Sequence, residues 1–151
     1  MPPYWAWGIH QCRWGYKNTF VFEGLYDNYI NKNIPLDAMW LDIDGMSNFE
    51  IFTLNQKKFG DLPQVINCKI HAKFIPIIDI AISYDPEEKN EYAKIGDENN
   101  LFIKSGCTKQ NLLGKVWTKK TVFPDFFNPK IYKLWDFGLN KYYDIVDYGL
   151  I

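Results

Sequence analysis

The feature that most limits the possible folds is a repeated alternation of short apolar runs with amphipathic, helix-like stretches. The apolar runs lie at residues 4–12, 38–44 and 74–82, and helical patterns at 19–32 and 61–70 separate them. This alternation is typical of parallel strands that are joined by helical crossovers. It therefore predicts an α/β fold built on a parallel sheet.

The helical stretches carry start and stop signals of their own. Thr19 is placed to cap the first helix and Asp61 the second, where Pro63 suits the first turn. Pro35 prevents the first helix from continuing. The apolar stripe of the first helix, which we expect to face the sheet, consists of Phe22, Leu25, Tyr26, Tyr29 and Ile30.

The remainder of the chain departs from this simple alternation. Residues 83–100 read as a charged loop, and residues 101–104 and 114–117 read as two short strands of a side hairpin. A third helix is expected from Asn128, and residues 148–151 resemble the start of a further apolar strand. The side chains of the third helix that are expected to face inward are Ile131, Leu134, Trp135 and Leu139.

A doubly wound sheet and a (β/α)8 barrel share this order of elements. A dinucleotide-binding fold places a glycine-rich turn after its first strand, whereas "CRWGYKN" at this position holds one glycine. The barrel is therefore favoured, although a full barrel takes about 250 residues. We expect a partial (β/α)8 TIM barrel of about the first four strands, with a small β-hairpin excursion after strand three. Residues 1–151 would form this single, incomplete domain.

Composition excludes several classes of function. The net charge is −1 without a basic patch, so no nucleic-acid partner is expected, and no apolar run approaches the length of a membrane span. Three widely spaced cysteines do not indicate a disulfide framework. His10 and Cys12 are too few ligands for a metal site, so none is expected. Aromatic residues make up 18% of the chain, and such rings serve as platforms for ligand faces as well as for a core.

The segment "MWLDIDGM" (residues 39–46) draws attention to one face of the second strand. With a period of two, Trp40 and Asp42 point to one face, and the apolar side chains between them point to the other. In a barrel, polar residues at the carboxyl ends of strands belong to the active face. We expect Asp42 to be functional, leave Asp44 open between function and structure, and expect Asp79 to be structural.

Six segments of the chain together resemble the catalytic barrel of glycoside hydrolase family 31, in particular its α-glucosidases of the lysosomal and intestinal type. They are "MPPYWAWGIHQCRWGYKN", "IPLDAMWLDIDGM", "FTLNQKKFGDLP", "IIDIAIS", "FIKSGCTKQNLLGKVW" and "FPDFFNP", in the order and with the spacing typical of the family. The resemblance covers almost the whole chain. It implies the amino-terminal half of a (β/α)8 barrel.

The resemblance also implies a sugar pocket. Asp42 matches the family's acid that holds hydroxyls of the terminal glucose, and Asp44 would support the pocket. Asp42 therefore accepts hydrogen bonds from sugar hydroxyls in this interpretation. The residues that match the walls of the pocket are Trp5, Trp40, Ile43, Ile82 and Trp117.

The implied reaction is retaining hydrolysis of terminal α-linked glucose from maltose-like oligosaccharides, which uses two carboxyl groups and no cofactor. In the family the nucleophile lies in a "W-I-D-M-N-E" type motif at the end of strand four, and the acid/base follows later. We expect both to lie beyond Ile151, so that this chain is an inactive fragment that lacks the remainder of its barrel. The family works in lysosomes, in the secretory pathway or outside cells. The alternatives are a non-catalytic remnant, a carbohydrate-binding module, or an interaction module that docks a protein partner through its aromatic surface.

Three positions depart from the family pattern. Ile80 stands where a proline usually follows the strand-three aspartate. Thr118 and Lys119 follow the hairpin tryptophan in place of Pro-Gly, and Tyr148 precedes Gly149 where the family has Asp-Gly. These departures raise the question of whether the loops of the pocket keep the family's geometry.

Overall fold

The structure is a computed structural model that describes residues 1–85, 87 and 90–146. The chain divides into two compact units. The first comprises Met1–Ser47, Thr53–Ile77 and the residues from Tyr143 onward, and the second comprises Asn48–Phe52 and Ile78–Tyr142.

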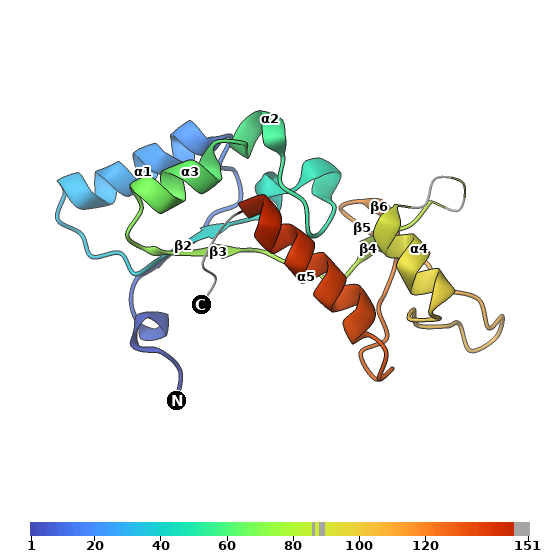
Figure 1. Cartoon of the computed structure of the whole chain (residues 1–151). Helices are drawn as coiled ribbons and strands as arrows, with labels where there is room; N and C mark the ends of the chain where they lie inside the picture. The colour runs from blue at the N-terminus through green and yellow to red at the C-terminus, as the bar shows by residue number, and fades with distance from the viewer. Residues whose placement is uncertain (86, 88–89, 147–151) are drawn as a thin grey trace. The chain divides into compact units, whose positions relative to one another are not determined.

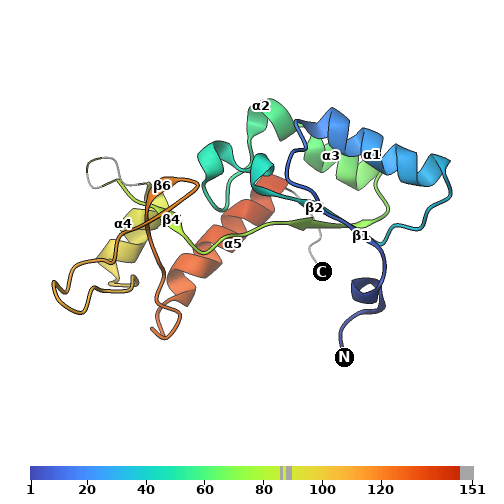
Figure 2. The same ribbon diagram turned by 180° about the vertical axis from the view of Figure 1, so that it is seen from behind.

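The first unit is built on a parallel sheet of three strands, in the order β1-β2-β3. The strands are β1 (His10–Gln11), β2 (Ala38–Leu41) and β3 (Lys73–Pro76). Helix α1 (Thr19–Asn31) connects β1 to β2, and α2 (Gln56–Phe59) and α3 (Leu62–Cys68) lie between β2 and β3. The predicted parallel pairing with helical crossovers is therefore confirmed, and Figures 1 and 2 show α1 and α3 side by side over the same face of this sheet.

The core of the first unit lies between this sheet and its two helices. Met39 and Leu41 of β2 are buried, and the ring of Phe22 in α1 meets the ring of Phe74 in β3 edge-on at 6.0 Å. Trp40, between Met39 and Leu41, is half-buried. The period-two prediction thus holds for Met39, Trp40 and Leu41, with Trp40 on the sheet face opposite α1 and α3. It does not extend to Asp44, which lies in a 3-10 turn after the strand has ended.

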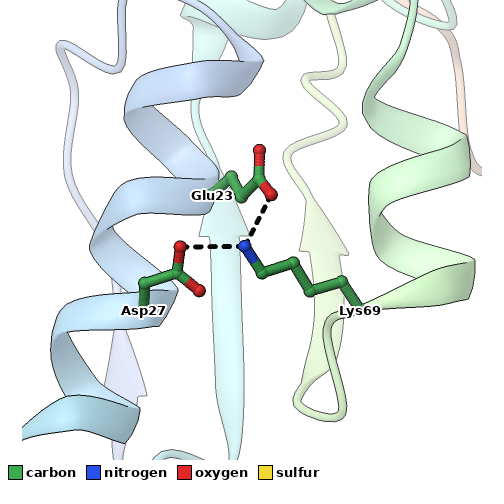
Figure 3. Close-up of polar contacts among 3 residues, drawn as sticks. All are labelled: Glu23, Asp27 and Lys69. Atoms are coloured by element: carbon green, nitrogen blue, oxygen red, sulfur yellow. Dashed lines mark hydrogen bonds and ion pairs between the residues drawn. The ribbon is translucent and has the colours of Figure 1, made fainter.

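An ion-pair cluster joins the two helices at the surface. Lys69, just after α3, lies 2.6 Å from a carboxylate oxygen of Glu23 and 2.8 Å from one of Asp27, both on α1 (Figure 3). Hydrogen bonds to Asp27 and Glu23 raise the pKa of the Lys69 ammonium, so the lysine stays charged. This cluster links α1 to the residue that follows α3. Because all three side chains are partly exposed, it contributes little to stability.

The first predicted strand, at residues 4–12, is wrong in most of its length. Residues Tyr4–Trp7 form a 3-10 turn (η1), closed by a hydrogen bond from the Gly8 N–H to the Trp5 carbonyl. Pairing with β2 begins only at His10. Pro3 leads directly into this turn, in which Tyr4 and Trp7 are exposed and Trp5 is half-buried.

The second and third strands are shorter than predicted. β2 ends at Leu41, and the chain then turns through two 3-10 segments, η2 (Ile43–Gly45) and η3 (Ser47–Phe49). The apolar run 74–82 is divided: β3 ends at Pro76, and Ile82 belongs to a strand of the second unit. One continuous apolar stretch therefore contributes strands to two different sheets. The hydrophobicity of the stretch does not indicate where it divides.

Both predicted helix starts fall within one residue of the observed ones, but the capping residue of the first was wrong. Asn18 caps α1, because its side-chain Oδ1 accepts a hydrogen bond of 3.0 Å from the Val21 N–H. Thr19 is the first helical residue and its hydroxyl donates to the Lys58 carbonyl. Of the predicted stripe of α1, Phe22 and Tyr26 are buried, whereas Ile30 is exposed. In α3, Asp61 occupies the predicted N-cap position and Pro63 lies in the first turn, but the Asp61 side chain makes no capping hydrogen bond.

The second unit is built on an antiparallel sheet in the order β4-β6-β5. Its strands are β4 (Ile82–Ser83), β5 (Gly114–Val116) and β6 (Lys119–Val122). The side hairpin is present, but β5 pairs with β6, and residues 101–104 contribute only isolated bridges. Trp117 lies in the turn of this hairpin instead of at the end of a paired strand.

Residues 83–100 are not wholly a loop, because they contain helix α4 (Glu91–Glu98). Asn90 caps it through a 2.8 Å hydrogen bond from the Ala93 N–H. Tyr92 and Ala93 are buried while Glu91 is exposed. The high charge of this segment reflects one solvated helix face, and it obscured the short apolar face.

The third predicted helix is α5 (Tyr132–Val146), which starts four residues after Asn128. Leu134 is fully buried, whereas Leu139, predicted to face inward, is 37% exposed. The ring of Trp135 meets the buried ring of Phe52 at 5.2 Å within the core of the second unit. The strand predicted at residues 148–151 lies outside the described residues. Among the helices that the structure describes, none is both long enough and apolar enough to span a bilayer.

Candidate substrate-binding site

The carboxyl end of β2 places Asp42 at the edge of the parallel sheet. Its backbone is still extended (φ −79°, ψ −171°), so its side chain continues the alternation and shares the face of Trp40. The carboxylate Oδ1 accepts a 2.6 Å hydrogen bond from the Ile43 N–H and thereby caps η2. Within the described part of the chain, Oδ2 has no hydrogen-bond partner. Asp42 therefore combines a position held by its own backbone with one oxygen available to accept hydrogen bonds.

Asp44 lies two residues further along and has a structural partner. Its Oδ2 accepts a 2.6 Å hydrogen bond from the Gly15 N–H, in the loop after β1. Gly15 has φ +120°, a conformation that residues with a side chain rarely adopt. Asp44 thus joins the loops that follow two neighbouring strands, which agrees with a supporting role for this carboxylate.

A histidine, His10, joins Trp5 and Trp40 in the first unit. Trp40 Nε1–H donates to His10 Nδ1 over 3.0 Å, so Nδ1 carries no proton. The proton of the neutral ring is then on Nε2, which donates to the Trp5 carbonyl oxygen over 3.1 Å. The ring of His10 also stacks on Trp5 at 6.0 Å and lies 5.9 Å from the ring of Trp40.

Sequence reasoning missed this role of His10, which it considered only as a metal ligand. The available signal was the strand pairing, because His10 of β1 lies opposite Ala38 of β2, two residues before Trp40. Among the described residues, no group of three or more His, Cys, Asp or Glu side chains could hold a metal ion. The neutral imidazole is already committed to two hydrogen bonds.

Cys12 lies just after β1, and the charge of Asp42 contributes to a shift in the pKa of its thiol. Partial burial and, second, the negative charge of Asp42 raise the pKa of the Cys12 thiol. A thiolate would lie beside a carboxylate, which disfavours it. Cys12 is therefore a thiol at neutral pH and no candidate nucleophile.

Ile43 and the two remaining predicted residues are placed differently. Ile43 begins η2 and is 4% exposed, packed into the core of the first unit. Ile82 and Trp117 belong to the second unit, where Ile82 is buried in β4 and Trp117 is 56% exposed. The structure thus brings together Trp5, Trp40, Asp42 and Ile43 within one unit. That Ile82 and Trp117 complete a pocket with them stays a prediction.

Asp79 lies in the segment between β3 and β4. Its Oδ1 accepts a 2.6 Å hydrogen bond from the N–H of Ile80, the residue that replaces the family's usual proline. A proline has no N–H to donate, so this bond depends on the departure from the pattern. The carboxylate of Asp79 is in this way held by its own neighbour.

Parallel strands with helical crossovers, and an acid at their carboxyl edge, are consistent with an α/β barrel-type domain. The family model "Glycosyl hydrolases family 31 TIM-barrel domain" matches residues 1–150. The chain belongs to glycosyl hydrolase family 31, as the resemblance predicted.

Individual relatives agree with this assignment. Lysosomal alpha-glucosidase of Rattus norvegicus is 36% identical over 147 residues, which cover 95% of this chain and 15% of the relative. The family 31 alpha-glucosidase of Bacteroides thetaiotaomicron has a solved structure that matches with a TM-score of 0.74 and 35% identity, over 97% of this chain and 24% of the other. A DNJ-bound structure of a glucosidase II alpha subunit matches with a TM-score of 0.76 and 26% identity, over 94% and 15%. The chain therefore spans less than a quarter of the length of these relatives.

Proposed function

We propose that residues 1–151 form part of the glucose-binding subsite of a retaining α-glucosidase that releases terminal α-linked glucose from maltose-like oligosaccharides. The observation that supports this most is Asp42, whose Oδ2 has no partner among the described residues and lies on the face of Trp40. A carboxylate oxygen can accept two hydroxyl donors of a sugar, and an indole can cover an apolar sugar face.

His10 would keep Trp40 in place for this contact. The indole N–H is bound by His10 Nδ1, so the flat face of the ring, rather than its polar edge, is left for the ligand. Trp5, Ile43, Ile82 and Trp117 are proposed as the other walls.

The chemistry would be supplied by two carboxyl groups elsewhere in the enzyme. The "W-I-D-M-N-E" type motif that carries the nucleophile in the family does not occur in residues 1–151. Asp42 is not proposed for that role, because one of its oxygens caps η2. We therefore propose that these 151 residues bind sugar weakly and do not hydrolyse it.

The test is a titration of the 151-residue chain with 1-deoxynojirimycin, followed through the indole and backbone resonances of Trp40 and Asp42. We expect saturable shifts that Asp42→Ala weakens at least about tenfold, equivalent to 1.4 kcal/mol. Asp61→Ala, which removes an exposed acid of the same unit, is the matched control and should bind like the parent chain. Equal binding by all three chains would contradict the subsite. Turnover of an aryl α-glucoside by the parent chain would contradict the proposed inactivity.

A second function, docking of a protein partner, is favoured by one observation. The side chains of Tyr4, Trp7 and Trp14 are 93%, 77% and 68% exposed in the first unit. If the sugar analogue does not bind while substitution of these rings by serine abolishes self-association or partner binding, docking is the better description.

A further inference from the structure

The second unit contains a cavity of about 630 Å³ on its antiparallel sheet. Residues 83–85, Lys115 and residues 118–120 line it. Its volume lies within the usual range of small-molecule sites. None of these residues belongs to the glucose subsite proposed above, so this cavity calls for an explanation of its own.

The register of the sheet puts two lysines and a tyrosine in one row along this cavity. Ser83 lies opposite Thr121, so the next pair is Tyr84 and Lys120, and the Tyr84 N–H donates to the Lys120 carbonyl over 3.0 Å. Lys120 in turn lies opposite Lys115. Because directly opposite residues project from the same face, these three side chains stand next to one another across three chain segments.

Among the described residues, the ammonium groups of this row have no ion-pair partner. Like charges that face each other across two strands repel, and Lys119 adds a third ammonium group at the turn. Within the described residues, none of the three lysines forms an ion pair. Among the described residues that line the cavity, the one acid is Asp85, whose Oδ1 accepts a hydrogen bond from the Glu87 N–H.

The turn beside these lysines offers a hydroxyl group. Thr118 Oγ1 is buried and has no hydrogen-bond partner within the described residues. A buried hydroxyl without a partner is unfavourable, and a ligand oxygen would satisfy it. Three lysines and Thr118 thus line the cavity, and among the described residues the Thr118 hydroxyl has no acceptor.

We propose that this cavity binds a tetrahedral dianion, namely a phosphate or sulfate group, either free or carried as an ester on a small sugar. Lys115 and Lys120 would neutralise its charge as two flexible point charges, and Thr118 would donate a hydrogen bond to one of its oxygens. The argument for this site does not rest on the proposed glucose subsite.

The test is a titration of the 151-residue chain with inorganic phosphate at low salt, followed by the backbone amide resonances of residues 115–121. Saturable shifts are expected, and the double variant Lys115→Gln/Lys120→Gln should lower the affinity at least about tenfold. Thr118→Val, which keeps the shape of the side chain, should lower it severalfold. Lys94→Gln/Lys130→Gln removes the same charge from exposed positions of the same unit and should change it less than twofold.

Parallel titrations with sulfate, glucose 6-phosphate and glucose distinguish the sources of the anion. Tighter binding of glucose 6-phosphate than of phosphate assigns the site to a sugar ester, and equal binding assigns it to the free anion; either result supports the proposal. Binding of glucose with the same affinity as glucose 6-phosphate would overturn it. So would shifts that do not saturate, or an equal loss of affinity in both double lysine variants. Amide spectra that match the parent chain verify that each variant is folded.

Discussion

At the scale of one residue, Asp42 has a structural role beside the binding role that we propose for it. Its Oδ1 caps η2 through the Ile43 N–H, while Oδ2 lies without a protein partner among the described residues. The turn therefore fixes the carboxylate before any ligand arrives, which lowers the entropic cost of binding.

The two roles of Asp42 can be separated by substitution. Asp42→Asn keeps an oxygen that can accept from the Ile43 N–H, and it should leave the free energy of unfolding within about 0.5 kcal/mol of the parent chain. Asp42→Ala removes the cap and should cost about 1 kcal/mol. Both variants should lose sugar binding. Urea unfolding measures the stabilities, and equal stability of the two variants would show that the cap contributes nothing.

Lys119 occupies a conformation that suits glycine, the residue usual at this place in the family. Its φ is +75°, just after the hairpin turn, where a side chain clashes with the backbone. Lys119 therefore adopts a left-handed backbone conformation that a glycine would adopt at lower cost.

Restoring glycine at this position should stabilise the second unit. We expect Lys119→Gly to raise the free energy of unfolding by about 1 kcal/mol, the cost of a left-handed conformation less the entropy that glycine loses. Lys119→Ala removes the same charge but keeps a Cβ atom, and it should show little gain. Thermal unfolding of both variants is the measurement, and an equal gain in both would assign the effect to charge instead of to the backbone.

At the scale of elements, helix α5 depends on a close approach to Phe52. A Cβ atom at Gly138 would lie 2.4 Å from the Phe52 ring, which is itself buried between aromatic neighbours. Gly24 in α1 has no atom within 4 Å of the same position. Gly138 is therefore required for close packing against Phe52, whereas packing does not require a glycine at position 24.

Alanine substitutions of these glycines should have opposite effects. Gly138→Ala should destabilise the chain by about 1–3 kcal/mol, because the core cannot accept the methyl group without moving an aromatic ring. Gly24→Ala should stabilise it by about 0.5–1 kcal/mol through helix propensity. Denaturant unfolding tests both, and destabilisation by Gly24→Ala would mean that α1 packs more closely at this point than the structure describes.

At the scale of the whole molecule, the free energy of unfolding at high pH depends on buried tyrosines of the second unit. Burial, and then the charges of Glu91 and Glu50, raise the pKa of Tyr92 to about 12, and burial raises that of Tyr142 as well. The folded state holds these protons more tightly than the unfolded chain. Their stabilising effect is complete below about pH 10 and is lost as the pH rises through about 12.

Removing the phenol should therefore shift alkaline unfolding. Tyr92→Phe loses only a weak 3.4 Å hydrogen bond to the Phe52 carbonyl, and its unfolding midpoint should lie at a higher pH than that of the parent chain. Tyr132→Phe alters an exposed tyrosine of α5 and is the control. Far-ultraviolet circular dichroism against pH gives the midpoints, and no difference between the two variants would contradict the assigned cause.

Local patterns in the sequence were sufficient for the parallel β/α order, for the start of α3 at Asp61 and for the face shared by Trp40 and Asp42. These features depend on the period of apolar residues and on the chemistry of neighbouring backbone groups, both of which lie within a few residues of sequence. The motifs were likewise sufficient for the family, because six of them in order constrain most of the chain.

Only the tertiary structure decided the features that depend on contacts distant in sequence. The apolar run 74–82 could serve one sheet or two, and the pairing of Ile82 with Val122 settled that it serves two. His10 acquired its role through Trp40, thirty residues away. Lys115 and Lys120, which line the cavity of the second unit, meet through the register of their strands. In each case the stabilising free energy comes from contacts with residues distant in sequence. The hydrophobicity or charge of a residue indicates which kind of partner stabilises it, but does not identify that partner.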